Sequence, residues 1–143
     1  MGDAPVLVDS IEECDELRLD FEKLAKAISK CPDIVPVAVQ DVETREIILI
    51  AYTNKEAMLK CVETRIATFW STSRNGLWIK GQSSGNTFDL VEIRVNCEQN
   101  SLVYIVRSRG EGICHTRNSQ GKARNCYYRS FNLDTGRLDF IDK

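Results

Sequence analysis

The chain has 143 residues and 43% of them are hydrophobic, which is enough for one domain with its own core. Its formal charge of −2, from 19 basic and 21 acidic residues, excludes a general attraction for nucleic acid or for anionic membranes. No apolar run approaches the roughly 20 residues that cross a bilayer, and the acidic N-terminus lacks the pattern of a signal peptide, so we expect a cytoplasmic protein.

The N-terminal part of the chain has the pattern of an amphipathic helix. Ser10 and Glu13 have the spacing of a capping box. An apolar face follows at helical spacing, made by Leu17, Phe21, Leu24 and Ile28. We interpret residues 1–32 as a helical extension that packs at the edge of the domain and carries no chemistry, and residues 33–143 as the domain itself.

The middle of the chain alternates between strand and helix patterns. Residues 35–40 and 46–52 are rich in β-branched and aliphatic residues and flank a polar turn, which predicts a hairpin. Asn54 can cap a helix over 55–63. Further segments with strand character are 68–70, 90–95, 102–106 and, as a candidate, 125–131.

Three cysteines in the C-terminal half are candidate metal ligands. Cys97 lies in a predicted turn between strands, Cys114 precedes His115, and Cys126 follows later. Three protein ligands with a vacant fourth position are typical of catalytic zinc, but the chain has no C-x-x-C pair, so ordinary buried cysteines are an alternative. His115 is the single histidine and therefore the natural general acid or base near neutral pH, with a structural histidine as the alternative.

The polar segment 71–86 can bind phosphate. Its hydroxyl groups and glycine amides can donate to phosphate oxygens while Arg74 and Lys80 supply charge, and two flanking tryptophans can stack on a base. The candidate substrate-binding residues are Trp70, Ser71, Ser73, Arg74, Trp78, Lys80, Gly81, Ser83, Ser84, Gly85 and Asn86. Asn75-Gly76 is a strong turn signal, so an exposed hairpin with ordinary polar residues is the alternative.

Five blocks of sequence together resemble the phosphoribosyl-AMP cyclohydrolase family of histidine biosynthesis. The blocks are VPVAVQDVET from Val35, AYTNKEA from Ala51, FWSTSRNGLWIKGQSSGN from Phe69, CHT from Cys114 and NCYYR from Asn125. Their order and spacing agree with the family over about 35–129, and the third block is long and distinctive.

The resemblance implies an α+β fold with a small, twisted, mainly antiparallel sheet, one or two packing helices, and a homodimer that shares zinc at its interface. The implied zinc ligands are Cys97, Cys114 and Cys126. The implied reaction is zinc-dependent hydrolysis of the N1–C6 bond of the adenine ring in 1-(5-phosphoribosyl)-AMP. In this scheme His115 passes a proton to the departing ring nitrogen, and Arg74 and Lys80 neutralise one of the two phosphates.

The chain departs from the family pattern around the first zinc cysteine. The family has D-C-D-x-D there, with carboxylates that hold magnesium, whereas this chain has Asn96, Cys97, Glu98, Gln99 and Asn100. One acid remains, at Glu98, and magnesium prefers carboxylate oxygens. The sequence therefore predicts a weak or lost magnesium site.

Other departures from the family pattern leave the identity of the substrate undecided. Gln82 stands where the family has Glu, Phe88 stands where it has Gln, and an insertion with extra basic residues separates Cys114 from Cys126. The insertion predicts an altered phosphate contact or a different substrate. We therefore keep three interpretations: the cyclohydrolase itself, a hydrolase of another modified purine nucleotide, and a non-catalytic nucleotide- or RNA-binding protein.

Overall fold

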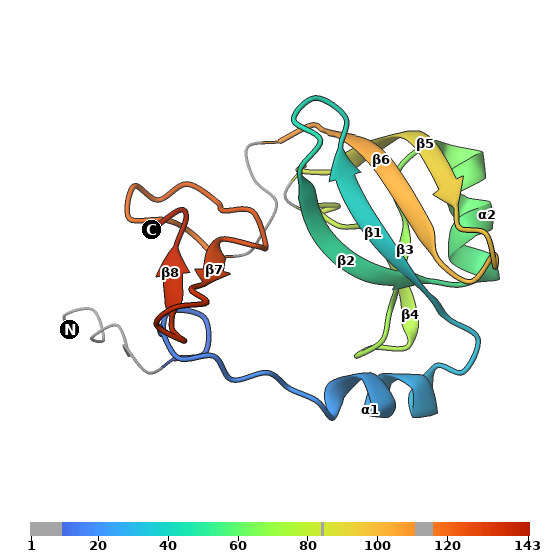
Figure 1. The fold of residues 1–143 in the computed structure, drawn as a ribbon. Helices are drawn as coiled ribbons and strands as arrows, with labels where there is room; N and C mark the ends of the chain where they lie inside the picture. Colours follow the sequence, from blue (N-terminus) through green and yellow to red (C-terminus); the bar gives the residue numbers. More distant parts are fainter. Residues whose placement is uncertain (1–9, 84, 111–115) are drawn as a thin grey trace, which may run out of the picture.

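The computed structural model describes residues 10–83, 85–110 and 116–143, and its centre is a twisted four-stranded sheet (Figure 1). The sheet contains β1 (Val35–Asp41), β2 (Ile47–Thr53), β5 (Phe88–Val95) and β6 (Leu102–Ser108) in the order β2-β1-β6-β5. β1 pairs with β2 and β5 pairs with β6 in antiparallel fashion, while β1 and β6 are parallel. The prediction of a mainly antiparallel sheet is confirmed.

The helix and hairpin after β2 follow the local sequence signals. α2 (Lys55–Thr64) begins at Asn54, whose Oδ1 accepts a hydrogen bond from the backbone N–H of Ala57 at 2.9 Å. β3 (Phe69–Ser71) and β4 (Gly76–Trp78) then form an antiparallel hairpin. The predicted capped helix and strand are therefore confirmed, and the turn signal at Asn75-Gly76 is confirmed as the turn of a hairpin whose second strand is β4.

The core lies between one face of the sheet and the layer formed by α2 and β3. Tyr104 of β6 is fully buried there, and its ring packs 5.5 Å from the ring of Phe69. The Tyr104 hydroxyl donates to Thr53 Oγ1 at 3.2 Å and accepts from Cys61 Sγ at 3.6 Å. Burial raises the pKa of Tyr104, so this hydroxyl stays protonated and the core contains a satisfied polar network.

The other face of the sheet presents apolar side chains outward. Ile50 of β2 pairs with Ala38 of β1, which pairs with Val103 of β6, so the three residues form a row across the sheet. Ile50 is 56% exposed. No helix among the described residues is long and apolar enough to cross a membrane.

The first helix is much shorter than the sequence pattern predicted. α1 spans Lys23–Lys30, and Ser10 begins only a turn in which its carbonyl oxygen accepts the N–H of Cys14 at 2.8 Å. The predicted capping box is wrong because tertiary contacts use this segment: the Tyr128 hydroxyl donates to the carbonyl of Glu12 at 2.5 Å. The helix itself begins after Glu22, and just before it Asp20 Oδ1 accepts the N–H groups of Glu22 and Lys23, each at 3.1 Å.

The orientation of α1 also differs from the prediction. Leu24 and Ile28 are each 50% exposed and Phe21 is 86% exposed, whereas Ala27 is buried. The predicted apolar face therefore points away from the domain. The face that contains Ala27 points inward and carries lysine residues.

The two ends of the chain pack together in what we call the terminal unit, residues 10–16 and 116–143. The hairpin of β7 (Arg129–Phe131) and β8 (Leu138–Phe140) stands apart from the central sheet, beside the N-terminal segment (Figure 1). The backbone N–H of Leu138 donates to the carbonyl of Asp15 at 2.7 Å. The strand candidate near the C-terminus is therefore confirmed in part, and its partner strand comes from the tail.

Candidate functional site

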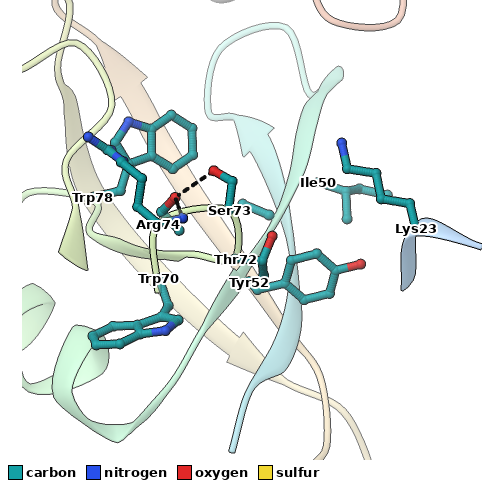
Figure 2. Close-up of a pocket in the computed structure, with 10 residues that line it drawn as sticks. Lys23, Ile50, Tyr52, Trp70, Thr72, Ser73, Arg74 and Trp78 are labelled. Carbon is teal, nitrogen blue, oxygen red and sulfur yellow. Dashed lines mark hydrogen bonds between the residues drawn. The ribbon is translucent and has the colours of Figure 1, made fainter. Parts of the chain in front are cut away.

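A surface pocket of about 370 Å³ lies beside the β3–β4 hairpin (Figure 2). It is lined by Lys23, Ile50, Ala51, Tyr52, Trp70, Ser71, Thr72, Ser73, Arg74 and Trp78. A pocket of this size is within the usual range for small-molecule sites. Among the described residues its lining contains two cations and no carboxylate, so it favours an anionic ligand.

The turn between β3 and β4 fixes the polar side of this pocket. Asn75 has a φ of 50°, and its Oδ1 accepts the indole N–H of Trp70 at 3.0 Å. The hydroxyls of Ser71 and Ser73 lie 3.2 Å apart, and Ser71 Oγ accepts the backbone N–H of Arg74 at 3.3 Å. Asparagine tolerates the left-handed conformation, which explains why this turn closes at Asn75-Gly76.

The predicted substrate-binding block divides into two halves. The first half lines the pocket and comprises Trp70, Ser71, Ser73, Arg74 and Trp78. The second half does not line it and comprises Lys80, Gly81, Ser83, Gly85 and Asn86, while Ser84 lies outside the described residues. The sequence could not reveal this division because both halves belong to one continuous motif.

The second half of the block folds against itself and against Gly110. A Cβ atom on Gly81, which has a φ of 78°, would lie 2.1 Å from the backbone oxygen of Asn86. A Cβ atom on Gly110 would lie 1.6 Å from Asn86 Oδ1. Both glycines are therefore needed for this close approach, which brings Asn86 next to the residue that precedes segment 111–115.

Two of the three predicted zinc ligands lie in the described part of the chain. Cys97 is exposed in the turn between β5 and β6. Cys126 is also exposed, and its backbone N–H donates to the carbonyl of Ile48 at 3.3 Å. Cys114 and His115 lie outside the described residues. Exposed thiols are chemically suited to zinc, although the described residues by themselves bring no three His, Cys, Asp or Glu side chains together for a metal.

The residues at the family's magnesium position do not fit magnesium. Asn96 Nδ2 donates to Asn100 Oδ1 at 2.6 Å, so the two amides bond to each other. Asn96 Oδ1 also accepts the backbone N–H groups of Asn100 and Ser101, each at 2.9 Å. These oxygens already serve the turn, and Glu98 is the one carboxylate beside them.

The inserted loop before Cys126 directs one of its cations inward. Arg124 is 1% exposed, and its guanidinium lies 3.8 Å from the ring centroid of Tyr128. Its Nη2 pairs with Glu13 Oε1 at 2.5 Å. Arg124 therefore belongs to the terminal unit, whereas Arg117 and Lys122 of the same loop are exposed.

Five residues that line the pocket are not among the predicted substrate-binding residues: Lys23, Ile50, Ala51, Tyr52 and Thr72. Ile50 and Tyr52 read simply as members of a strand, and their place beside the pocket depends on how the hairpin crosses β2. No sequence pattern marks Lys23 as a binding residue, because it reaches residues 72–74 only through the packing of segments that are far apart in the sequence.

Comparison with known proteins finds one family consistently. A model of the phosphoribosyl-AMP cyclohydrolase family matches residues 49–128. A phosphoribosyl-AMP cyclohydrolase of Hyphomonas neptunium is 35% identical over 139 residues, which cover 97% of this chain and 94% of that protein. The enzyme of the same name from Archaeoglobus fulgidus is 42% identical over 101 residues, 71% of this chain and 88% of that protein. A bifunctional histidine biosynthesis protein of Aquifex aeolicus is 38% identical over 96 residues, 67% of this chain and 44% of that protein.

Proposed function

The chain belongs to the phosphoribosyl-AMP cyclohydrolase family, and from that premise we propose that it hydrolyses the N1–C6 bond of the adenine ring in 1-(5-phosphoribosyl)-AMP, as a step of histidine biosynthesis. The observation that carries this proposal is the acid-free pocket beside β3 and β4, lined by the part of the motif that contains Trp70, Ser73 and Arg74. An anionic nucleotide fits such a lining.

The described residues would bind and orient the substrate. The Ser71 and Ser73 hydroxyls and the Arg74 guanidinium would hold phosphate oxygens, and Tyr52 and Trp78 would offer aromatic surface to the purine. Holding the nucleotide in one orientation would lower the entropic part of the barrier to ring opening, because the substrate and the reacting groups would already be positioned. His115 would protonate the ring nitrogen that leaves, a role assigned from its place in the family motif.

We propose Cys97, Cys114 and Cys126 as zinc ligands. Support comes from the exposure of the two cysteines in the described residues, since exposed thiols can reach a metal. Bound zinc would act as a Lewis acid that lowers the pKa of a water molecule to near neutrality. Magnesium is not part of this proposal, because the Asn96 and Asn100 amides already bond to each other and to the turn backbone.

The proposed assembly is a homodimer. Its support is the open face of the sheet, where Ile50, Ala38 and Val103 form an apolar row next to the pocket that Ile50 also lines. Exposed apolar rows of this kind are typical of protein interfaces. Sedimentation of the zinc-loaded protein tests this assembly, and a monomer at micromolar concentration would contradict it.

Turnover of 1-(5-phosphoribosyl)-AMP by metal-stripped protein, resupplied first with zinc and then with zinc plus magnesium, tests the function. The ring opening is followed by its ultraviolet change. We expect full activity with zinc alone and none after His115→Ala. Absence of turnover from folded, zinc-loaded protein would point to another modified purine nucleotide, and full activity of His115→Ala would refute the proposed proton transfer.

A further inference from the structure

The inward face of α1 lies against the substrate pocket. Lys23, Lys26 and Lys30 have the spacing of one helical face, together with the buried Ala27. A second cavity of about 120 Å³ lies between this face and residues 72–73. Lys23, Thr72 and Ser73 line both cavities, so the smaller cavity continues the larger one toward α1.

The charges around the two cavities are all of one sign. Arg74 and the three lysines of α1 line them, and no carboxylate in the described ranges does. In the described part of the chain, Lys26 has an exposed ion pair with Glu22 at 3.6 Å, whereas the ammonium groups of Lys23 and Lys30 have no ion pair. The four cations repel one another, and an anion between them would relieve that repulsion.

The position of α1 is fixed by specific contacts at its end. Cys31 directly follows the helix, is 3% exposed, and donates its thiol hydrogen toward Asn75 Oδ1 at 3.3 Å. The same Asn75 oxygen accepts the indole N–H of Trp70, which lines the pocket. The Asn75 side chain therefore links the end of α1 to the β3–β4 turn. On the helix side, Ala27 lines the smaller cavity together with Thr72 and Ser73.

Figure 2 shows where the two cations of the larger cavity lie. Lys23 comes from α1 on one side of the view and Arg74 from the β3–β4 turn on the other side, with Thr72, Ser73 and Tyr52 drawn between them. A ligand that spans the pocket would therefore meet a cation at each end.

We propose that the lysine face of α1, chiefly Lys23 and Lys30, binds one phosphate group of the substrate. This inference rests on the proposed function, because it needs a substrate with more than one phosphate. The nucleotide occupies the larger cavity, and one phosphate reaches the smaller cavity between α1 and Ser73. α1 lies outside residues 49–128, the range that the family model matches, so the N-terminal segment would contribute this phosphate subsite from outside that range.

The test neutralises lysines on α1 and compares the effect on substrate binding with the effect of neutralising a lysine elsewhere on the surface. Lys23→Gln with Lys30→Gln removes two cations from the lysine face. Lys55→Gln is the matched control, because Lys55 is exposed on α2, lines neither cavity and has no ion pair among the described residues. Equal thermal unfolding of all three proteins establishes that each is folded.

We expect the double variant to raise KM for 1-(5-phosphoribosyl)-AMP about 10- to 100-fold with kcat changed less than about threefold, since charge-assisted contacts to a remote phosphate act on binding. Lys55→Gln should leave KM unchanged. If the wild type turns over the substrate and the double variant has the wild-type KM, the inference is refuted and the proposed function stands.

A binding experiment separates the inference from the proposed function. If the wild type shows no turnover, calorimetry compares 1-(5-phosphoribosyl)-AMP, which has two phosphates, with AMP, which has one. The inference then requires that the wild type bind the two-phosphate compound about tenfold or more tightly than AMP and that the double variant lose most of this preference. A preference that is equal in both proteins would refute the lysine subsite independently of catalysis.

Discussion

Replacing Glu13 with glutamine tests how strongly one buried cation holds the terminal unit together. Arg124 is 1% exposed, and its Nη2 donates to Glu13 Oε1 at 2.5 Å. Its remaining donors bond to Thr116 Oγ1 at 3.3 Å and to the carbonyl of Asp142 at 3.4 Å. After Glu13→Gln the charge of Arg124 stays buried with neutral acceptors alone.

The expected cost follows from the burial of the two partners. Removing one partner of a buried ion pair costs about 3–5 kcal/mol. Glu13 is 34% exposed, so water can replace part of the lost carboxylate. We therefore expect Glu13→Gln to lower the free energy of unfolding by about 2–3 kcal/mol. With an unfolding entropy of about 0.3 kcal/mol per kelvin for a chain of this length, the melting temperature should fall by roughly 7–10 °C.

The matched control is Asp15→Asn, which removes the same charge from the same N-terminal segment. Asp15 pairs with Arg137 at 2.6 Å, but the two side chains are 55% and 59% exposed. An exposed pair contributes little because water already screens it, so we expect a far smaller change in melting temperature. Thermal unfolding followed by circular dichroism measures both variants. Equal effects of the two, or a Glu13→Gln protein within about 1 °C of the wild type, would refute the role assigned to Arg124.

Three further predictions concern the turns and the protein surface. In the double variant Asn96→Asp with Asn100→Asp, two carboxylates would repel each other where two amides now bond at 2.6 Å. Its melting temperature should therefore fall in the presence of chelator and recover when Mg²⁺ is added. A melting temperature of the wild type that rises with Mg²⁺ would contradict this. Glycine at position 75 tolerates the local φ of 50°, so Asn75→Gly removes the side chain without straining the turn. The Cys31 thiol, which donates to Asn75 Oδ1 in the wild type, should then react faster with a thiol reagent. Unchanged reactivity of Cys31 would show that Asn75 does not hold the end of α1 in place. A hydrogen bond from Arg137 lowers the pKa of Asp15, so this carboxyl stabilises the fold above pH about 4 and loses that effect as the pH falls through the folded pKa. The difference in melting temperature between the wild type and Asp15→Asn should therefore shrink as the pH falls below about 4, and a difference that does not change with pH would contradict the ion pair.

Elements with strong local signals could be predicted from the sequence. Asn54 stops the preceding strand and caps α2, because its side chain accepts an N–H three residues later. Asn75-Gly76 similarly closes the β3–β4 hairpin through a left-handed asparagine. In both places the determining contact spans only a few residues, so the chemistry is visible in the local sequence.

The N-terminal helix could not be predicted, because its boundaries depend on distant residues. The helical spacing of Leu17 and Phe21 is real, but the segment before them pairs with the C-terminal tail through Asp15 and Leu138. In the structure the Asp15 carbonyl accepts the N–H of Leu138 in the tail, and residue 15 is not helical. The helix that does form begins after Glu22, whose side chain makes no capping hydrogen bond, so no local signal in the sequence marks this start.

The candidate site divides in the same way between local and distant information. The motif identified Trp70, Ser73 and Arg74, which are neighbours in the sequence and in the pocket. The motif could not identify Lys23, about fifty residues away, whose place depends on the packing of α1. The distribution of apolar and charged residues also failed to predict the orientation of α1, because its lysine face points toward the domain and its apolar face points outward.

The net charge of −2 and the anion preference of the pocket are compatible, because electrostatic attraction at a site is a local property. Charges farther away than about 8–10 Å are largely screened at physiological ionic strength. In the part of the chain that the structure describes, the lining of the two cavities holds Arg74 and the lysines of α1 without an acid, so the sum of these lining charges is positive. In the proposal made above, the position of α1, held at Asn75, is therefore what gives this acidic protein a pocket for phosphate. Phosphate binding should accordingly weaken with added salt in the wild type and much less in a protein that lacks the lysine charges.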